Sequence, residues 1–515
     1  MYELKSDNKR IAKNTIYLYI RMLFILIVSL YTSRVILSYL GVTDYGISNV
    51  VGGFISLFAF LNTSLTGAIQ RFYNYEGSKR GDDGIKDVFI TSCYIQIVLA
   101  VIVVIIAETI GLWYMYNKMV IPEERFAAAM VLYQVSIVSM FFVIVQIPFS
   151  SLILSLERMN YYALVGVMDV VLKLILILLM PFFPGDKLVV FSIISLILSI
   201  VNFLLYYLYA KIIIKIPAFS LRLKDFDVRL FRSMLSFSGW NFLGTFAQVG
   251  YTQGISLVLN LFFGPVINAA RGVSSQIVGA LRGFSINIVV AFRPQLVDSY
   301  AKNDYQRTRT IMFLEAKACY LMVLILILPI IIDIDYILVL WLGENVPDYA
   351  AIFTSLVLIN LLVSSCNSPF SQVMHAVGDI KYFQIVTSII TIANIPISYV
   401  FLKRGCSPEM VFVVGIIISI ISQIACVLIV KHYFKFSVRD YLVEVIFPCI
   451  IVTILSPLIP LIFYYTMDSS IIRTVTILFT SVLSSMVSTF LFAMNKPERE
   501  IVICKAKHYL KIDHK

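Results

Sequence analysis

Apolar residues in this chain form long runs that are separated by short polar segments. Most of these runs are close to the roughly 20 residues that an α-helix needs to cross a bilayer. The pattern predicts about fourteen spanning helices. We place them at 12–38, 44–69, 87–113, 126–154, 160–183, 187–210, 233–260, 265–292, 310–332, 349–374, 380–402, 408–430, 441–465 and 471–493. The expected fold class is therefore an all-α polytopic membrane protein.

Composition and charge support this class. Hydrophobic residues make up 60% of the 515 positions, and charged residues only 14%. The net charge of +11 is spread over short loops and forms no patch, which argues against nucleic acid as a partner. Most lysines and arginines fall in alternate loops, so the positive-inside rule places both termini in the cytoplasm. The seven cysteines show no CxxC or pairing pattern, and we expect neither a disulfide framework nor a metal site.

Two alignments of the chain with itself indicate an internal repeat. At a shift of 221 residues the Pro-Phe-Ser at 148–150 falls on the Pro-Phe-Ser at 369–371, and at a shift of 223 residues Gly41 falls on Gly264. Such a duplication relates the first six helices to the next six, as parallel repeats, because six crossings return the chain to the same side. The predicted domains are an N-lobe 1–210, a basic cytoplasmic linker 211–232, a C-lobe 233–432, two additional helices 433–495 and a basic cytoplasmic tail 496–515.

The segment from Asn268 to Gln295 is long enough to span a bilayer, yet it carries Arg271, Arg282 and Arg293 at a spacing of eleven. Eleven residues are close to three helical turns, so the arginines lie on one stripe that drifts by about 20° per step. An arginine at mid-bilayer depth costs at least about 2.5 kcal/mol and faces a protein interior or a wet cavity. The stripe predicts a path for an anion. The alternative is a structural role, by pairing with acidic residues or snorkelling to the interfaces.

Other polar side chains in the predicted spans are candidates for the same cavity or for ion coupling. Arg34 lies in the first helix, and Arg71 ends the second. Asp169 and Lys173, at i and i+4, either neutralise each other or couple transport to an ion. Glu315 either pairs with an arginine of 265–292 or has a coupling role. Amide side chains in the spans either hold helices together or line a cavity: Asn62, Asn241, Gln248, Asn268 and Gln276.

Signatures of catalysis and cofactor binding are missing from the sequence. It contains no Walker-type glycine loop, no GxSxG and no HExxH. The loops also leave no room for the large extracytoplasmic domain expected of a membrane glycan polymerase or ligase. We therefore expect a transporter that is not an enzyme and needs no cofactor.

Three stretches resemble a known family: residues 11–54 (IAKNTIYLYI…NVVGGF), the QRFY at 70–73 and the PFS that ends the fourth helix. Together with the helix count and the two six-helix lobes, they resemble the Wzx-type polysaccharide and O-antigen flippases of the multidrug/oligosaccharidyl-lipid/polysaccharide (MOP) superfamily. The resemblance covers essentially the whole chain and is strongest in residues 11–80.

This resemblance implies a bacterial inner-membrane protein of polysaccharide or lipopolysaccharide biosynthesis. It would move an undecaprenyl-diphosphate-linked oligosaccharide, an O-antigen or capsule repeat unit, to the periplasmic leaflet by alternating access. Arg34, Arg271 and Arg282 would bind the diphosphate, while Arg71 and Arg293 would attract the head group at the cytoplasmic side. Its partners would be this substrate, membrane lipids and other polysaccharide-assembly membrane proteins. The alternatives are a lipid II flippase or a drug/cation antiporter of the same superfamily.

Overall fold

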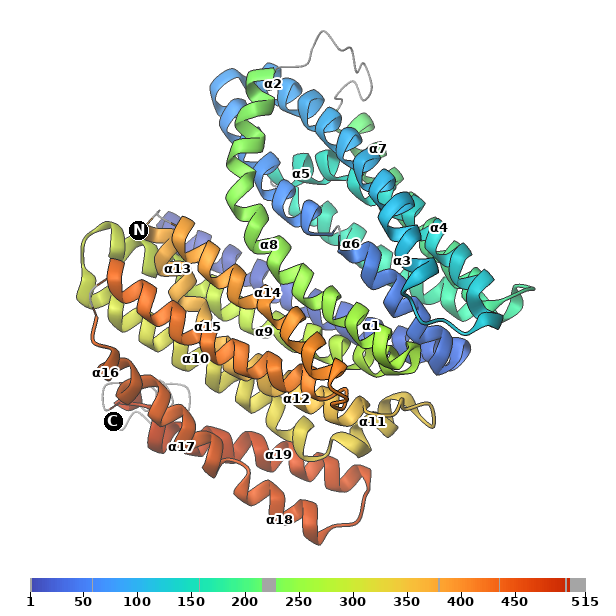
Figure 1. Ribbon diagram of the computed structural model, residues 1–515. Helices are drawn as coiled ribbons and strands as arrows, with labels where there is room; N and C mark the ends of the chain where they lie inside the picture. Colours follow the sequence, from blue (N-terminus) through green and yellow to red (C-terminus); the bar gives the residue numbers. More distant parts are fainter. Residues whose placement is uncertain are drawn as a thin grey trace. The chain divides into compact units, whose positions relative to one another are not determined.

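The computed structural model describes residues 2–57, 59–156, 158–214, 228–377, 380–434, 436–495 and 498–500. Over these residues the chain consists of helices joined by short connections, without any strand (Figure 1). Eleven of its helical stretches are long and apolar enough to cross a membrane. The predicted fold class, an all-α polytopic membrane protein, is confirmed.

The helices divide into two compact units, Met1–Gly272 with Ser398–Pro408 and Val273–Ile397 with Glu409–Lys515. These units are defined by contacts, whereas the predicted lobes were defined by the repeat, and the lobe boundaries stay predictions. Residues 215–227 of the predicted linker lie outside the described residues. So do residues 496, 497 and 501–515 of the predicted tail.

In the first unit, α8 packs against α1 and α2, α4 packs against α7, and α5 packs against α2. Its helices begin and end as follows: α1 (Tyr2–Ser56), α2 (Ala59–Ile106), η1 (Ala107–Gly111), α3 (Leu112–Asn117), α4 (Glu123–Val145), α5 (Ile147–Ser155), α6 (Met159–Leu179), η2 (Met180–Phe182), α7 (Lys187–Ile212), α8 (Val228–Phe263) and the first turns of α9 (Pro265–Ala301). Two of these elements, α1 and α2, each contain a sharp turn, at Gly41 and Gly81. The turns separate the first three predicted spans.

In the second unit, α10 packs against α12, α13 and α19, α12 packs against α15, and α18 and α19 form a hairpin (Figure 1). Besides the rest of α9, its elements are α10 (Tyr305–Ile332), α11 (Ile334–Leu342), α12 (Ala350–Ser364), η4 (Ser365–Asn367), α13 (Ser368–Val377), α14 (Lys381–Lys403), α15 (Met410–Tyr433), α16 (Val438–Tyr441), η5 (Leu442–Ile446), α17 (Phe447–Leu455), α18 (Leu458–Thr466), α19 (Ile471–Ser488) and η6 (Thr489–Ala493). The last residues of α14, from Ser398 onward, belong to the first unit.

Several predicted spans are interrupted helices. The span 44–69 is divided, because α1 ends at Ser56 and α2 begins at Ala59. The span 126–154 divides into α4 and α5 next to Pro148, and the span 349–374 divides into α12, η4 and α13 next to Pro369. Proline has no backbone N–H and fits the first turn of a new helix, so both breaks fall just before a proline.

The two helices α8 and α9 contain 36 and 37 residues, which is ample length for a crossing. Both carry amide and arginine side chains, and in hydrocarbon such groups need protein or water partners. The predicted spans 233–260 and 265–292 thus fall on long helices that contain polar side chains.

Backbone turns agree with the predicted duplication. Residues with positive φ fall at matching connections in the two halves, at separations of 223, 222 and 220 residues: Gly41 (74°) with Gly264 (76°), Gly81 (61°) with Asn303 (58°), and Gly185 (104°) with Gly405 (84°). Only glycine, and less readily asparagine or aspartate, adopts this left-handed region without a steric penalty. The turns between helices therefore repeat along with the sequence.

Each unit also buries its copy of the Pro-Phe-Ser motif in a core of its own. Phe149 is buried and packs edge-on against Phe89, with ring centroids 5.2 Å apart. Phe370 is buried and packs edge-on against Tyr441, also at 5.2 Å. The first core draws on α2, α4, α5, α6, α7 and α8, and the second on α9, α10, α13, α14, α15, α16 and η5. The motif that revealed the repeat is thus a core-forming element in both halves.

We predict that Gly41→Ala and Gly264→Ala each destabilise the protein by about 1–2 kcal/mol, because a Cβ is strained at these positive φ angles. Gly166→Ala is the control, since Gly166 lies in α6 with open space around it. It should leave stability unchanged or raise it slightly. Thermal unfolding of the purified variants in one detergent measures the difference. Equal melting temperatures for all three variants would contradict the role assigned to the turns.

Candidate functional site

The predicted arginine stripe lies on a single helix. Arg271, Arg282 and Arg293 all belong to α9, which runs from Pro265 to Ala301. The 22 residues from the first arginine to the last correspond to about 33 Å of helix. This length is close to the roughly 30 Å thickness of the bilayer hydrocarbon. The three charges therefore mark the beginning, middle and end of one membrane-spanning distance.

Arg271 is anchored by α8. Its Nε donates a hydrogen bond to the Ser256 hydroxyl (2.6 Å), and its Nη2 donates to the backbone carbonyl of Thr252. These two acceptors lie one helical turn apart on α8, and Ser256 is buried. Both are neutral, so they fix the orientation of the guanidinium without cancelling its charge. Arg282 and Arg293, by contrast, have exposed side chains.

Glycines bring α1, α8 and α9 into close contact beside Arg271. A Cβ built on Gly272 would lie only 2.6 Å from the amide of Asn49, and a Cβ on Gly53 would lie 2.9 Å from Gln253 Oε1. A Cβ on Gly46 would overlap the carbonyl oxygen of Pro265. Small residues allow helices in a membrane to approach closely enough for polar contacts between them. The position of Arg271 thus depends on tight packing of three helices.

The predicted amide candidates occupy different environments. Asn268 is buried, and its Nδ2 donates to the carbonyl of Gly264 at 3.2 Å. Gln276 is half-buried, and Gln248 is exposed on α8. The side chains of Asn62 and Asn241 lie outside the described residues. The Asn268 side chain therefore bonds back to the residue just before its own helix, and cavity lining by the others stays a prediction.

The other predicted cations lie on the first two elements of the chain. Arg34 on α1 and Arg71 on α2 are exposed and, like Arg271, belong to the first unit. Arg282 and Arg293 belong to the second unit. A common diphosphate site formed by Arg34, Arg271 and Arg282 stays a prediction.

The two acidic candidates for ion coupling both accept hydrogen bonds from amide side chains. Asp169 of α6, one turn from Lys173 on the same helix, accepts from Asn202 Nδ2 of α7 at 2.6 Å. Glu315 of α10 is fully buried and accepts from Gln372 Nε2 of α13 at 2.5 Å. Its donors among the described residues are thus Gln372 and, at 3.5 Å, the Ser368 hydroxyl, and no arginine of α9.

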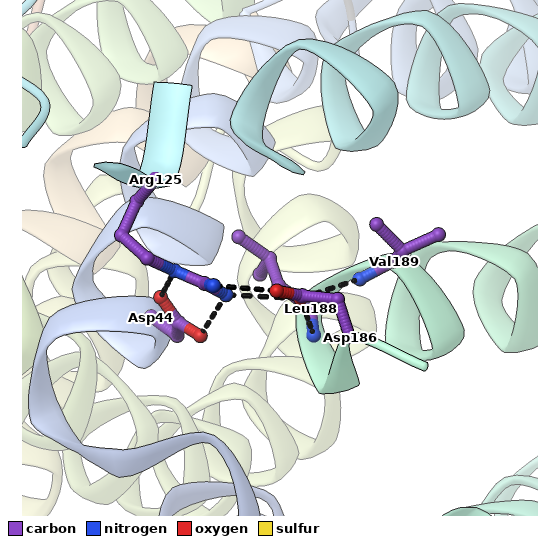
Figure 2. Close-up of polar contacts among 5 residues, drawn as sticks. All are labelled: Asp44, Arg125, Asp186, Leu188 and Val189. Carbon is purple, nitrogen blue, oxygen red and sulfur yellow. Dashed lines mark hydrogen bonds and ion pairs between the residues drawn. The ribbon is translucent and has the colours of Figure 1, made fainter. Parts of the chain in front are cut away.

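Sequence reasoning missed a charged cluster in the first unit (Figure 2). Arg125, in the first turn of α4, lies between Asp44 of α1 and Asp186, and it contacts both oxygens of each carboxylate. Its Nε and Nη2 donate to Asp44 at 2.8 and 2.5 Å, and its Nη1 and Nη2 donate to Asp186 at 2.5 and 2.9 Å. Bidentate pairs of this kind are the strongest arginine contacts. They join the start of α4, the start of α7 and the part of α1 that follows the turn at Gly41.

Asp186 has a second role in this cluster. It caps α7 by accepting from the backbone N–H groups of Leu188 (2.9 Å) and Val189 (3.4 Å) (Figure 2). The hydrogen bonds from Arg125 hold the pKa of Asp186 below its usual value, with smaller help from the capped amides and against the opposing effect of burial. The cap itself was recognisable in the sequence, because an aspartate precedes the apolar run that starts at Lys187. Its pairing with Arg125 was not.

We predict that Arg125→Gln lowers the melting temperature, because it leaves two partly buried carboxylates next to each other without a counter-charge. Arg80→Gln is the matched control. Arg80 also bridges two carboxylates, Glu76 and Asp87, but its side chain is 40% exposed, and exposed pairs contribute about 0–1 kcal/mol. A loss for Arg125→Gln no larger than for Arg80→Gln would show that the cluster does not hold the helices together.

The depressed pKa of Asp186 predicts a pH dependence. A carboxyl whose pKa is lower in the folded protein adds stability above its ordinary pKa of 3.8, and this stability is lost as the pH falls through the folded value. The melting temperature of the wild type should therefore fall steeply below about pH 4. Asp186→Asn should be less stable at neutral pH and show a flatter acid limb. Parallel acid limbs for the two proteins would contradict this prediction.

Comparison with known proteins shows which solved structures have a similar fold. No protein-family model matches the chain. The chain is 21% identical, over 374 residues, to EpsK of Bacillus subtilis (strain 168), an uncharacterized membrane protein, with 71% of this chain and 72% of that protein covered. Among solved structures, the lipid II flippase MurJ in an inward closed conformation matches with a TM-score of 0.69 at 15% identity, over 93% of this chain and 98% of MurJ. An inward-facing multidrug resistance MATE family transporter of the MOP superfamily matches with a TM-score of 0.65 at 15% identity, over 81% of this chain and 98% of the transporter.

These structural neighbours are transporters and flippases and not enzymes. At identities near 15% the likeness establishes the architecture and not the substrate. The protein is thus a multi-pass membrane protein whose fold is similar to those of MurJ and of this MATE family transporter.

Proposed function

We propose that the protein is a flippase for an undecaprenyl-diphosphate-linked oligosaccharide, an O-antigen or capsule repeat unit, in the bacterial inner membrane. The observation that carries this proposal is the row of Arg271, Arg282 and Arg293 along α9. A diphosphate head group has to pass through the full thickness of the hydrocarbon, and it needs cationic partners over that whole distance. A stripe of about 33 Å offers them at regular intervals.

The chemistry of arginine suits this task. Guanidinium stays charged at any physiological pH and binds phosphate oxygens by two parallel N–H···O bonds. At Arg271 the Nε and Nη2 donate to two neutral acceptors of α8, which orient the guanidinium. A diphosphate can exchange one arginine for the next along the stripe. No single contact then has to be so strong that it prevents release.

Alternating access would move the substrate from one leaflet to the other. Transporters built from two related repeats place their substrate between the repeats and rock one against the other. The matched turns, such as Gly41 with Gly264, support such a duplication here. In this proposal both termini are cytoplasmic, Arg71 and Arg293 attract the head group from that side, and Arg34 joins Arg271 and Arg282 in binding it.

A lipid II flippase is the second candidate, and one observation favours it. The MurJ structure covers 93% of this chain, against 81% for the MATE transporter. A lipid II head group would need the same cationic path, so charge alone does not separate the two substrates. Complementation of strains that lack one flippase or the other separates them. A drug/cation antiporter fits less well, because it would favour acidic groups along the path.

We predict that Arg271→Ala and Arg282→Ala each abolish translocation while the protein still folds, and that Arg→Lys at either position keeps partial activity because the charge remains. The measurement is the leaflet accessibility of the lipid-linked oligosaccharide in proteoliposomes with each variant. Arg307→Ala is the control, because Arg307 is an exposed arginine of α10 outside the stripe. Full translocation by both alanine variants of the stripe would refute the proposed path.

A further inference from the structure

Gln96 of α2 is a buried amide whose two ends are unpaired among the described residues. Its side chain has 0% exposure, and neither its Nε2 nor its Oε1 forms a hydrogen bond there. Buried polar side chains normally have at least one partner, either in the protein or in an ordered water. An amide that is unpaired at both ends therefore indicates that a further polar molecule binds beside it.

The stripe of α2 that carries Gln96 faces α4 and α5. Phe89 and Gln96 are seven residues apart, so they lie within about 20° of each other around the helix. The Phe89 ring packs edge-on against Phe149 of α5, with ring centroids 5.2 Å apart. Beyond Gln96, the carbonyl of Ala107 accepts a hydrogen bond from the Tyr133 hydroxyl of α4 at 2.7 Å. The Gln96 side chain lies between these two contacts and leaves α2 on the side of α4 and α5.

The same two contacts give the height of Gln96 along its neighbours. Between them α2 and η1 advance from 89 to 107, while the antiparallel segment on the other side returns from 149 to 133. The backbone of Gln96 is thus level with about residues 142–144. A side chain on a helix tilts toward the N-terminus of its own helix, which here is the direction of higher numbers in α4 and α5. The amide of Gln96 therefore lies at the level of 145–147, where α4 ends and α5 begins.

The break between α4 and α5 supplies a second polar group at this level. Pro148 lies in the first turn of α5 and has no N–H, so the carbonyl of Ile144, four residues earlier, lacks its usual helical donor. The Ile144 side chain is buried in the core shared by α2, α4 and α5. A backbone carbonyl in such a place needs a donor from another source. The break thus adds an acceptor beside the unpaired amide.

Water is the molecule whose chemistry fits these groups. The amide of Gln96 offers one donating and one accepting end, and the Ile144 carbonyl offers an acceptor, so the ligand must both donate and accept hydrogen bonds. All of these groups are neutral, and the core around them is otherwise apolar. An ion would lack a counter-charge there, whereas a buried water typically makes about three hydrogen bonds to groups of this kind.

We infer that the first unit contains a buried water-binding site between α2 and the break between α4 and α5. The Gln96 amide and the Ile144 carbonyl are its polar partners. Because a bound water can follow the carbonyl when the angle between α4 and α5 changes, the site makes this break a hinge that does not leave backbone groups bare. The inference does not depend on the substrate that the protein carries.

The first test is the sign of a stability change in the purified full-length protein. Gln96→Met keeps the length of the side chain and removes both polar atoms. If water joins the amide to the break, the variant leaves the water and the carbonyl short of a partner, and its melting temperature falls. If the amide is dry, methionine removes an unpaired buried group, and the melting temperature rises. An unchanged or raised melting temperature would overturn the inference.

Leu99→Met is the matched control. Leu99 lies three residues further along α2 and is partly buried against the same core. An exchange of leucine for methionine conserves volume and removes no polar group, so it should change the melting temperature less than Gln96→Met does.

The second test separates a bound water from a direct bond between Gln96 and the backbone, and it needs only the wild type. Hydroxyl radicals that X-rays generate from a bound water modify the side chains next to it, even where bulk water has no access. Ile144, which is 2% exposed, should be modified in the wild-type protein in nanodiscs. Phe353 is the control, because it is fully buried against Phe412 in the second unit and should stay unmodified. An Ile144 side chain as unreactive as Phe353 would overturn the inference.

Discussion

The structure depends on one constraint, which is that hydrocarbon solvates neither backbone amides nor charged side chains. Every charge in a membrane-spanning segment must therefore find a partner in the protein, reach water or bind a ligand. The clearest pairing is in the second unit, where Arg473 donates to Asp333 at 2.5 Å and both side chains are buried. That pair fixes the beginning of α19 against the end of α10, and it needs no ligand.

Three charged side chains, Arg125, Arg271 and Glu315, differ in the groups that they contact. Arg125 is bridged by two carboxylates, as a structural cation should be. Arg271 donates to a hydroxyl and a backbone carbonyl of α8, which orient its guanidinium. Glu315 is the acidic counterpart, buried with an amide donor on only one of its oxygens. The proposed anion path rests on the spacing of the arginines along α9.

The duplication explains why the two units are alike in their turns and cores but differ in their charged side chains. Turn geometry and core packing are general requirements of any helical repeat, so Gly41 with Gly264 and Phe149 with Phe370 are matched. The arginines Arg271 and Arg282 have no arginine counterpart in 41–70. The arginines of the proposed diphosphate path thus belong to features that the duplication does not require.

The sequence by itself determined the helical class, most spans, the repeat and the eleven-residue arginine spacing, because hydropathy and helical periodicity are local properties of the chain. It also marked Pro148 and Pro369, although not that the helices break beside them. The tertiary structure decided which charges are paired. Arg125 meets Asp44 across 81 residues, and Gln372 meets Glu315 across 57 residues. Partners so far apart are chosen by how helices pack against each other, and no local pattern encodes that choice.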